Sequence, residues 1–197
     1  MNHNYYPMLK KLASIFVIIV SLQSCAAVIV AGATGGAIIA NDRRTAGILI
    51  EDQNIELKFS SRLSENPAVD NNSHLNAVSY NGVVLIVGQT PQQDYKDLIG
   101  EFTRKIPSVK RLHNEVRVSA PNSLMNRSSD SYITSKIKTT MTFEKNFTSS
   151  AIKVVTENGE VFLMGLVSKQ EAELAIAITK NVDGVQKVID VFEYIPE

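Results

Sequence analysis

The only thiol in this 197-residue chain is that of Cys25, and it stands at the end of a segment with the layout of a secretory signal. Cys25 closes the tetrapeptide Leu22-Gln23-Ser24-Cys25, which follows a run of apolar and small residues over 12–22. Two lysines, Lys10 and Lys11, stand directly before that run. A basic start, an apolar stretch and a small residue before the cleavage point are typical of a secretory signal. A single cysteine also excludes an internal disulfide and a thiolate metal site.

The segment resembles the signal of bacterial lipoproteins, although Gln23 is an uncommon residue at its position in that pattern. By this resemblance, the thiol of Cys25 receives a diacylglycerol, residues 1–24 are removed as a signal peptide, and the freed amine is acylated. The alternative is one transmembrane helix over residues 12–40, since this span carries no charge and exceeds the roughly 20 residues that cross a bilayer. Under either interpretation the chain starts at a membrane.

The composition is that of an ordinary globular protein with balanced charge. Without Lys10 and Lys11 the chain has 18 basic and 20 acidic residues, which argues against a nucleic-acid-binding protein. Residues 25–51 are predicted to form an apolar tether, whose uncharged part over 26–40 either lies against the bilayer or serves only as a connection. For Arg43 and Arg44 at its end, a solvated linker is favoured over contact with lipid phosphates, because two charges are a weak signal.

From residue 52 onward the chain contains an internal repeat. Apolar residues four positions apart predict a helical stripe, and the same spacing returns 78 positions later. The first set is Ile55, Phe59 and Leu63, and the second is Ile133, Ile137 and Met141. The dipeptides Asn81-Gly82 and Asn158-Gly159 each separate two strand-like runs, which predicts two hairpins with type I′ turns. Gly88 and Gly165, near the ends of the second strands, are interpreted as requirements of backbone geometry.

A second helix follows each hairpin. Thr90-Pro91 and Ser168 provide N-cap signals, with helices predicted over about 92–105 and 169–181. Each unit closes on an alternating strand, over 112–118 and 188–194. The hairpin gives an antiparallel pair and the helix permits a parallel crossover, so each unit is predicted to be αββαβ, with a three-stranded mixed sheet and two helices on one face. The fold class is α+β, with domains over 52–120 and 129–197 and a polar linker over 121–128.

The repeated pattern resembles the BON domain, and residues 154–167 carry the resemblance most clearly. Two such domains behind a lipoprotein signal are similar to dual-BON lipoproteins of the outer membrane. The resemblance implies a lipid-anchored protein of the outer membrane that faces the periplasm, binds anionic phospholipid and supports membrane integrity without catalysis. Ala26 after the lipidated cysteine suggests release to the outer membrane. The alternative is a scaffold that binds an envelope protein, such as an outer-membrane assembly or peptidoglycan-remodelling component.

The family resemblance places the lipid contact on the first helix of the second domain, at residues 129–138. Helical geometry places its exposed face opposite the stripe that begins at Ile133. The candidate phospholipid-binding residues are Tyr132, Ser135, Lys136, Lys138 and Thr139. A phenol suits the headgroup boundary, and lysines pair with phosphate oxygens. The family favours tryptophan at the position of Tyr132, so shallower insertion is expected; the alternative is a Tyr132 ring packed on the other domain or on the linker.

The helix of the first domain is a useful comparison, because Asn54 stands at the position equivalent to Tyr132. That helix is therefore expected to be a poorer membrane surface.

Catalytic chemistry is not predicted. His74 and His113 lie outside any metal-binding spacing, and the glycines over 32–36 lack the lysine of a phosphate-binding loop. Neither a cofactor nor a metal is expected.

Overall fold

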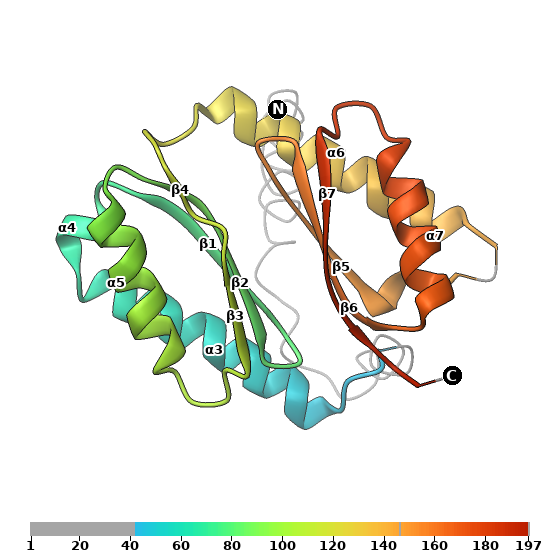
Figure 1. The fold of residues 1–197 in the computed structure, drawn as a ribbon, viewed down its shortest axis with the longest axis horizontal. Helices are drawn as coiled ribbons and strands as arrows, with labels where there is room; N and C mark the ends of the chain where they lie inside the picture. The colour runs from blue at the N-terminus through green and yellow to red at the C-terminus, as the bar shows by residue number, and fades with distance from the viewer. Residues whose placement is uncertain (1–41, 146, 197) are drawn as a thin grey trace, which may run out of the picture. The chain divides into compact units, whose positions relative to one another are not determined.

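The computed structural model describes residues 42–145 and 147–196, in which the predicted helix and strand order occurs twice (Figure 1). Asn41–Glu197 is one compact unit. The first domain consists of α3 (Ala46–Ser64), α4 (Pro67–Asp70), β1 (His74–Tyr80), β2 (Val83–Thr90), α5 (Gln93–Arg104), β3 (Arg111–Asn114) and β4 (Arg117–Val118). The second consists of α6 (Leu124–Phe143), the short 3₁₀ helix η2 (Ser149–Ala151), β5 (Ile152–Glu157), β6 (Glu160–Val167), α7 (Lys169–Lys180) and β7 (Lys187–Tyr194). In the described residues, none of the helices combines the length and apolarity needed to cross a bilayer.

Each domain has a mixed sheet, as predicted. In the first, β1 pairs antiparallel with β2, and β3 pairs parallel with β2. The short strand β4 continues this parallel pairing in the same register after a break, and it is the one addition to the predicted three strands. In the second domain, β5 and β6 are antiparallel, and β7 runs parallel to β6. The α+β class is therefore confirmed.

Both Asn-Gly turns adopt the conformation that the sequence predicts. The φ angles are 54° at Asn81 and 77° at Gly82, and they are 54° at Asn158 and 71° at Gly159. Positive φ at both central residues is the signature of a type I′ turn, whose twist matches that of the flanking strands. The two hairpins are thus equivalent parts of a repeat.

Each turn is held by a buried carboxylate from the first helix of its domain. Asp52 accepts the N–H groups of Asn81 and Gly82 at 2.8 Å each. Asp130 accepts those of Asn158 and Gly159 at 2.9 and 2.8 Å. The same offset of 78 positions that relates the apolar stripes relates Asp52 to Asp130. The carboxylates therefore fix where α3 and α6 cross their sheets.

Gly88 and Gly165 serve backbone geometry, as predicted. A Cβ atom at Gly88 would lie 1.9 Å from the carbonyl oxygen of His74, and one at Gly165 would lie 2.4 Å from that of Ala151. Both distances are far below contact, so any larger residue would force the neighbouring strand away. The strands β2 and β6 nevertheless continue past these glycines.

Three local predictions differ from the structure. The first helix begins at Ala46 with Thr45 as N-cap, and α6 begins at Leu124 with Ser123 as N-cap. Residues 124–128 are thus helical, although they were predicted to be linker. Thr90 does not cap α5, because it remains in β2 and its hydroxyl lies 2.9 Å from that of Ser73. Ser168 does cap α7, in a full capping box with Glu171.

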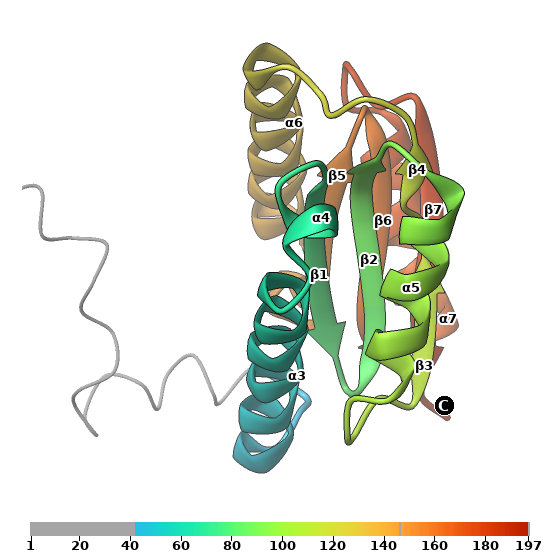
Figure 2. The same cartoon turned by 90° about the vertical axis from the view of Figure 1, so that its left-hand side faces the viewer.

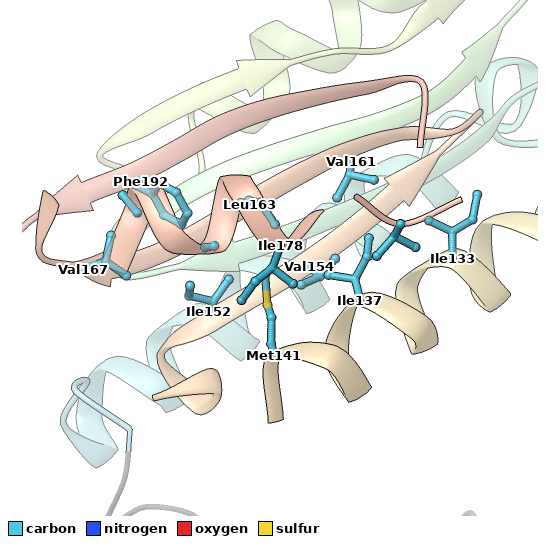
Figure 3. Close-up of a cluster of buried hydrophobic side chains, with 13 residues drawn as sticks. Ile133, Ile137, Met141, Ile152, Val154, Val161, Leu163, Val167, Ile178 and Phe192 are labelled. Atoms are coloured by element: carbon cyan, nitrogen blue, oxygen red, sulfur yellow. The ribbon is translucent and has the colours of Figure 1, made fainter. Parts of the chain in front are cut away.

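The helices of each domain pack on one face of its sheet. In the second domain, the predicted stripe of Ile133, Ile137 and Met141 packs on apolar residues of β5, β6 and α7 (Figure 3). In the first, Ile55 and Phe59 of α3 contact the face of β2 and the residues of α5. Fully burying an aliphatic side chain stabilises a fold by about 1.5–3 kcal/mol, so these stripes supply much of the force that holds the helices in place.

The opposite faces of the two sheets form a third apolar cluster, shared by both domains. It unites residues of β1 and β2 with residues of β5, β6 and β7: Val78, Tyr80, Val83, Leu85, Val87, Val155, Phe162, Met164 and Val191. Asn122 lies where the domains are joined, and its side-chain amide donates to Glu157 at 3.2 Å while its N–H donates to Gln89 at 3.1 Å. Residues 121–128 are therefore not a free linker.

The segment that precedes α3 is bound to both domains. The guanidinium group of Arg43 donates to Glu171 at 2.6 and 2.8 Å and to the carbonyl of Leu166 at 2.7 Å. Arg44 donates to Asp52 at 2.9 Å, and its guanidinium carbon lies 3.9 Å from the ring centroid of Tyr80. The prediction that the two arginines belong to a solvated linker is wrong, because both find carboxylates inside the fold.

Replacing Asp130 with asparagine is expected to destabilise the protein. The two oxygens of the Asp130 carboxylate accept one backbone N–H group each, from Asn158 and Gly159. In asparagine only one oxygen remains to accept, and the NH₂ group that replaces the other oxygen would face a backbone N–H donor. We expect Asp130→Asn to lower the free energy of unfolding by about 1–3 kcal/mol, measured by urea denaturation of the protein lacking residues 1–40. Asp183→Asn is the control, because the Asp183 side chain is 94% exposed. Equal stability of the two variants would contradict this role.

The ion pair between Arg43 and Glu171 predicts a defined acid dependence. The hydrogen bonds from Arg43 lower the pKa of Glu171 from 4.5 to about 2. A lowered pKa in the folded state means that the charged pair stabilises the fold above pH 4.5 and that this contribution is lost as the pH falls towards 2. The difference in unfolding free energy between wild type and Glu171→Gln should therefore be constant at neutral pH and shrink in that acidic range. A difference that does not change with pH would exclude the ion pair as its cause.

Candidate functional site

The five predicted site residues lie together on the outward face of α6. Ile133, Ile137 and Met141 are buried against the sheet, and Ser135 and Thr139 are exposed on the opposite side. Tyr132 is 66% exposed, as the helical geometry predicted, and it is packed neither in the other domain nor in the linker. At about 100° per residue, Lys136 and Lys138 fall on the two flanks of this face.

The exposed face of α6 is more apolar than the five residues suggested. Met125 and Phe143 are each 82% exposed, and Leu124 is 79% exposed. Met125, Tyr132 and Phe143 lie within about 20° of one another around the helix axis, given their separations of 7 and 11 residues. They form a line along nearly the whole of a helix about 30 Å long. We call Met125, Tyr132 and Phe143 the α6 line.

Sequence reasoning missed Met125 and Phe143. Met125 fell within the predicted linker, and Phe143 lay beyond the end of the stretch taken from the family resemblance. Their spacing to Tyr132 contained the signal, because residues 7 and 11 positions apart share one side of a helix. A helix predicted to begin at Ser123, which is a favourable N-cap residue, would have revealed the line.

Positive charge at this face is partly compensated. The Nζ of Lys136 lies 2.9 Å from Oδ2 of Asp183, which precedes β7. The hydrogen bond to Asp183 raises the pKa of Lys136, and the same bond lowers the pKa of Asp183. Because both groups are exposed, the pair is screened by salt and exchanges readily with other partners. Lys138 has an exposed side chain on the other flank.

The carboxylate content of α6 is low. Its one acidic residue, Asp130, is 7% exposed and holds the hairpin turn. Along the rest of the helix, the exposed polar residues are hydroxyls, amides and cations, and several hydroxyls bond the helix itself, as Ser135 does to the carbonyl of Ser131 at 2.9 Å. A helix surface with this composition offers apolar area, hydroxyl donors and cations to a partner.

The equivalent helix of the first domain differs in charge. Ile50 and Leu57 of α3 are each 61% exposed, so this helix also presents aliphatic side chains. Glu51 and Asn54 lie on the exposed surface beside them. The Asn54 position therefore lacks the aromatic ring of its counterpart Tyr132, and α3 places a carboxylate on a surface where α6 places none.

Cys25 and the alternative transmembrane span over 12–40 lie outside the residues that the structure describes. Within the described ranges 42–145 and 147–196, no cluster of His, Cys, Asp or Glu side chains could hold a metal ion. The surface of α6 is the candidate site that the sequence predicted and that the described residues place on one exposed helix.

Comparison with protein families identifies the two repeats. The sequence model described as "BON domain" matches residues 51–120 and 129–196. These two ranges hold both αββαβ units except for the first residues of α3 and α6. The chain belongs to the BON-domain family.

Several curated proteins are similar to this chain. Outer membrane lipoprotein DolP of Haemophilus influenzae is 37% identical over 187 residues, which cover 95% of this chain and 97% of that protein. A 21 kDa hemolysin of Actinobacillus pleuropneumoniae is 34% identical over 154 residues, covering 78% of this chain and 79% of the relative. Osmotically-inducible protein Y of Escherichia coli is 38% identical over 73 residues, covering 36% of each chain.

The DolP match spans almost all of the sequence, including its N-terminal segment. It supports the predicted location of this chain in the outer membrane with a lipid anchor. It also supports an envelope-associated role for the pair of BON domains. None of these three relatives is named as an enzyme.

Proposed function

We propose that this protein is a periplasm-facing lipoprotein that binds anionic phospholipid through α6 of its second BON domain and thereby supports the integrity of the outer membrane. The observation that carries the proposal is the α6 line, bordered by Lys136 and Lys138 and free of exposed carboxylates along the helix. Apolar side chains flanked by cations are the usual features of helices that lie in a membrane interface.

The chemistry of the contact follows from the side chains. The ring of Tyr132 would enter the headgroup boundary with its hydroxyl towards water, and Met125 and Phe143 would bury apolar area on either side of it. Each cation near an anionic membrane surface contributes about 1 kcal/mol, so two lysines give selectivity for anionic lipid and only weak binding by themselves. An acyl group on Cys25 would hold the domains at the membrane, where a high effective concentration makes weak binding sufficient.

Vesicle flotation of the protein lacking residues 1–40 tests the proposal. We expect flotation with vesicles of phosphatidylglycerol and phosphatidylethanolamine, and none with phosphatidylcholine alone. Tyr132→Ala should weaken flotation because it removes the central ring of the α6 line. Lys136→Ala/Lys138→Ala should weaken it by up to about 30-fold, if each lysine contributes about 1 kcal/mol, and should reduce its salt dependence.

Matched controls exist on the first domain. Ile50→Ala removes an aliphatic side chain of comparable exposure from α3, and Lys58→Ala removes an exposed cation from the same helix. Neither should change flotation. Absence of flotation with every vesicle type, or equal effects of the α3 and α6 variants, would exclude α6 as the phospholipid surface.

Asp183 provides a second, opposite test. Its carboxylate occupies Lys136 and adds negative charge close to the proposed contact. We expect Asp183→Asn to strengthen binding to anionic vesicles, by about fivefold for the gain of roughly one unit of charge at the surface. Weaker flotation of this variant would show that Asp183 positions Lys136 productively and does not compete with lipid.

A further inference from the structure

The strand β1 forms an edge of its sheet (Figure 2), so half of its backbone N–H and C=O groups point away from β2. Tyr80 and Val83 flank the two-residue turn and form a hydrogen-bonded pair. In an antiparallel ladder every second residue bonds the neighbouring strand through its backbone, so counting back from Tyr80 gives the residues of β1 that bond β2. By this alternation, the N–H and C=O groups of Leu75, Ala77 and Ser79 point away from β2. The direction is verified at Ser79, whose N–H donates outward to Oε1 of Glu56 at 2.9 Å.

The outward groups of Leu75 and Ala77 differ from that of Ser79. Ser79 is covered by α3 and satisfied by Glu56, whereas no side chain or backbone group of residues 42–145 and 147–196 bonds the outward N–H of Leu75 or Ala77. Leu75 and Ala77 are only half-buried. An edge with free donors and acceptors is a template for pairing with another strand.

Grooves lie on both sides of this open stretch. One has a volume of 560 Å³, and Leu57, Phe59 and Leu63 of α3 line it together with Leu75 and Ala77. The other has a volume of 630 Å³ and lies between β1 and the α6 and β5 residues Arg127, Ser131 and Lys153. Both grooves include Leu75 and Asn76 in their walls, so the edge of β1 is accessible from either side.

The two grooves differ in chemistry. The groove on α3 combines apolar side chains, of which Leu57 is 61% exposed, with the carboxylates of Glu56 and Asp70, and no lysine or arginine lines it, so it suits apolar side chains better than acidic ones. The groove on α6 contains two cations, and the Nε atom of Arg127 is buried without a hydrogen-bond partner among the described residues. A buried donor without a partner is rare and costs about 1–3 kcal/mol, which an incoming acceptor would recover.

The carboxylates beside Arg127 are already engaged. Both oxygens of Asp130 accept N–H groups of the hairpin turn, and Oε1 of Glu157 accepts from Gln89 at 2.6 Å and from Asn122 at 3.2 Å. Lys153 lies 3.4 Å from Glu56, a long ion pair with half-exposed partners. Arg127 is therefore the group in this groove that keeps an unpaired hydrogen-bond donor among the described residues.

We propose that the edge of β1 binds an extended polypeptide segment as an added strand, and that apolar and acidic residues alternate in this segment. Successive side chains of a strand point to opposite faces. One set would enter the groove beside Leu57 and Leu63, and the other would pass Arg127 and Lys153. The segment of this chain over 26–40 carries no acidic residue and so does not fit, which points to a partner protein. The groove on α6 adjoins the proposed phospholipid surface, because Ser135 lines it, but Met125, Tyr132 and Phe143 of the α6 line do not. The proposal does not depend on phospholipid binding.

Amide hydrogen exchange measured by NMR tests this proposal, with the protein lacking residues 1–40 and a short peptide of alternating valine and glutamate. The peptide should slow the exchange of the Leu75 and Ala77 amides. Two further peptides serve as controls, one with the same residues in two blocks and one with lysine in place of glutamate. Neither should protect these amides.

Two variants separate the contributions of backbone and charge. Ala77→Pro removes the outward N–H group without removing a hydrogen bond to β2, and it should lower the affinity for the alternating peptide by up to about tenfold. Ala77→Val keeps this N–H group and should leave the affinity unchanged. Arg127→Glu should make the protein bind the lysine peptide more tightly than the glutamate peptide. This test does not depend on the proline variant, so it remains valid if proline at position 77 disturbs the strand. Protection of these amides by anionic vesicles alone, by the block peptide equally, or by no peptide would overturn the proposal.

Discussion

The packing of the two sheets against each other is the constraint on which the other features of this structure depend. One face of each sheet is buried in the shared cluster around Tyr80, Leu85 and Phe162, so the helices of both domains are restricted to the remaining faces. There, Ile133 and Ile137 bury only one side of α6. The other side must be in contact with solvent or with a partner outside these domains. An exposed helix surface that carries the α6 line is therefore a consequence of how the domains pair.

The paired sheets also explain the residues of the central strands. All eight residues of β2 are buried, because one of its faces meets helices and the other meets the second domain. A strand buried on both faces needs an uninterrupted apolar run, and residues 83–87 provide it. This run served to predict a strand but not a partner for its second face. A run that is apolar on both faces also indicates that something covers the second face, which in this structure is the other domain.

The repeat made most of the fold predictable, because each unit supports the interpretation of the other. Turns, strand order and the apolar stripes of α3 and α6 depend on neighbouring residues, and they were predicted correctly. The surroundings of Lys136 could not be predicted in this way, since its partner Asp183 is 47 positions away. Arg43 was misjudged for the same reason, because Glu171 lies 128 positions away. Arg44 was misjudged for another reason: its partner Asp52 is only 8 positions away, but the helix α3 that presents it was predicted to begin later. The sequence shows which residues of a linker are charged, but only the folded structure shows which of these charges lie beside a carboxylate.

The contacts of Arg43 and Arg44 give the N-terminal segment a mechanical role. Arg43 is bound to the second domain through Glu171, and Arg44 is bound to the first through Asp52, whose carboxylate also holds the turn at Gly82. Tyr80 lies against Arg44 and donates a hydrogen bond to the carbonyl of Ala151 at 3.1 Å, so this region connects the turn of the first hairpin with the start of the second. A pull on this segment from a membrane anchor would be shared by the two domains instead of by α3 alone. The anchor would then restrain the pair as one body, and the orientation of α6 towards a membrane would be set by the whole pair.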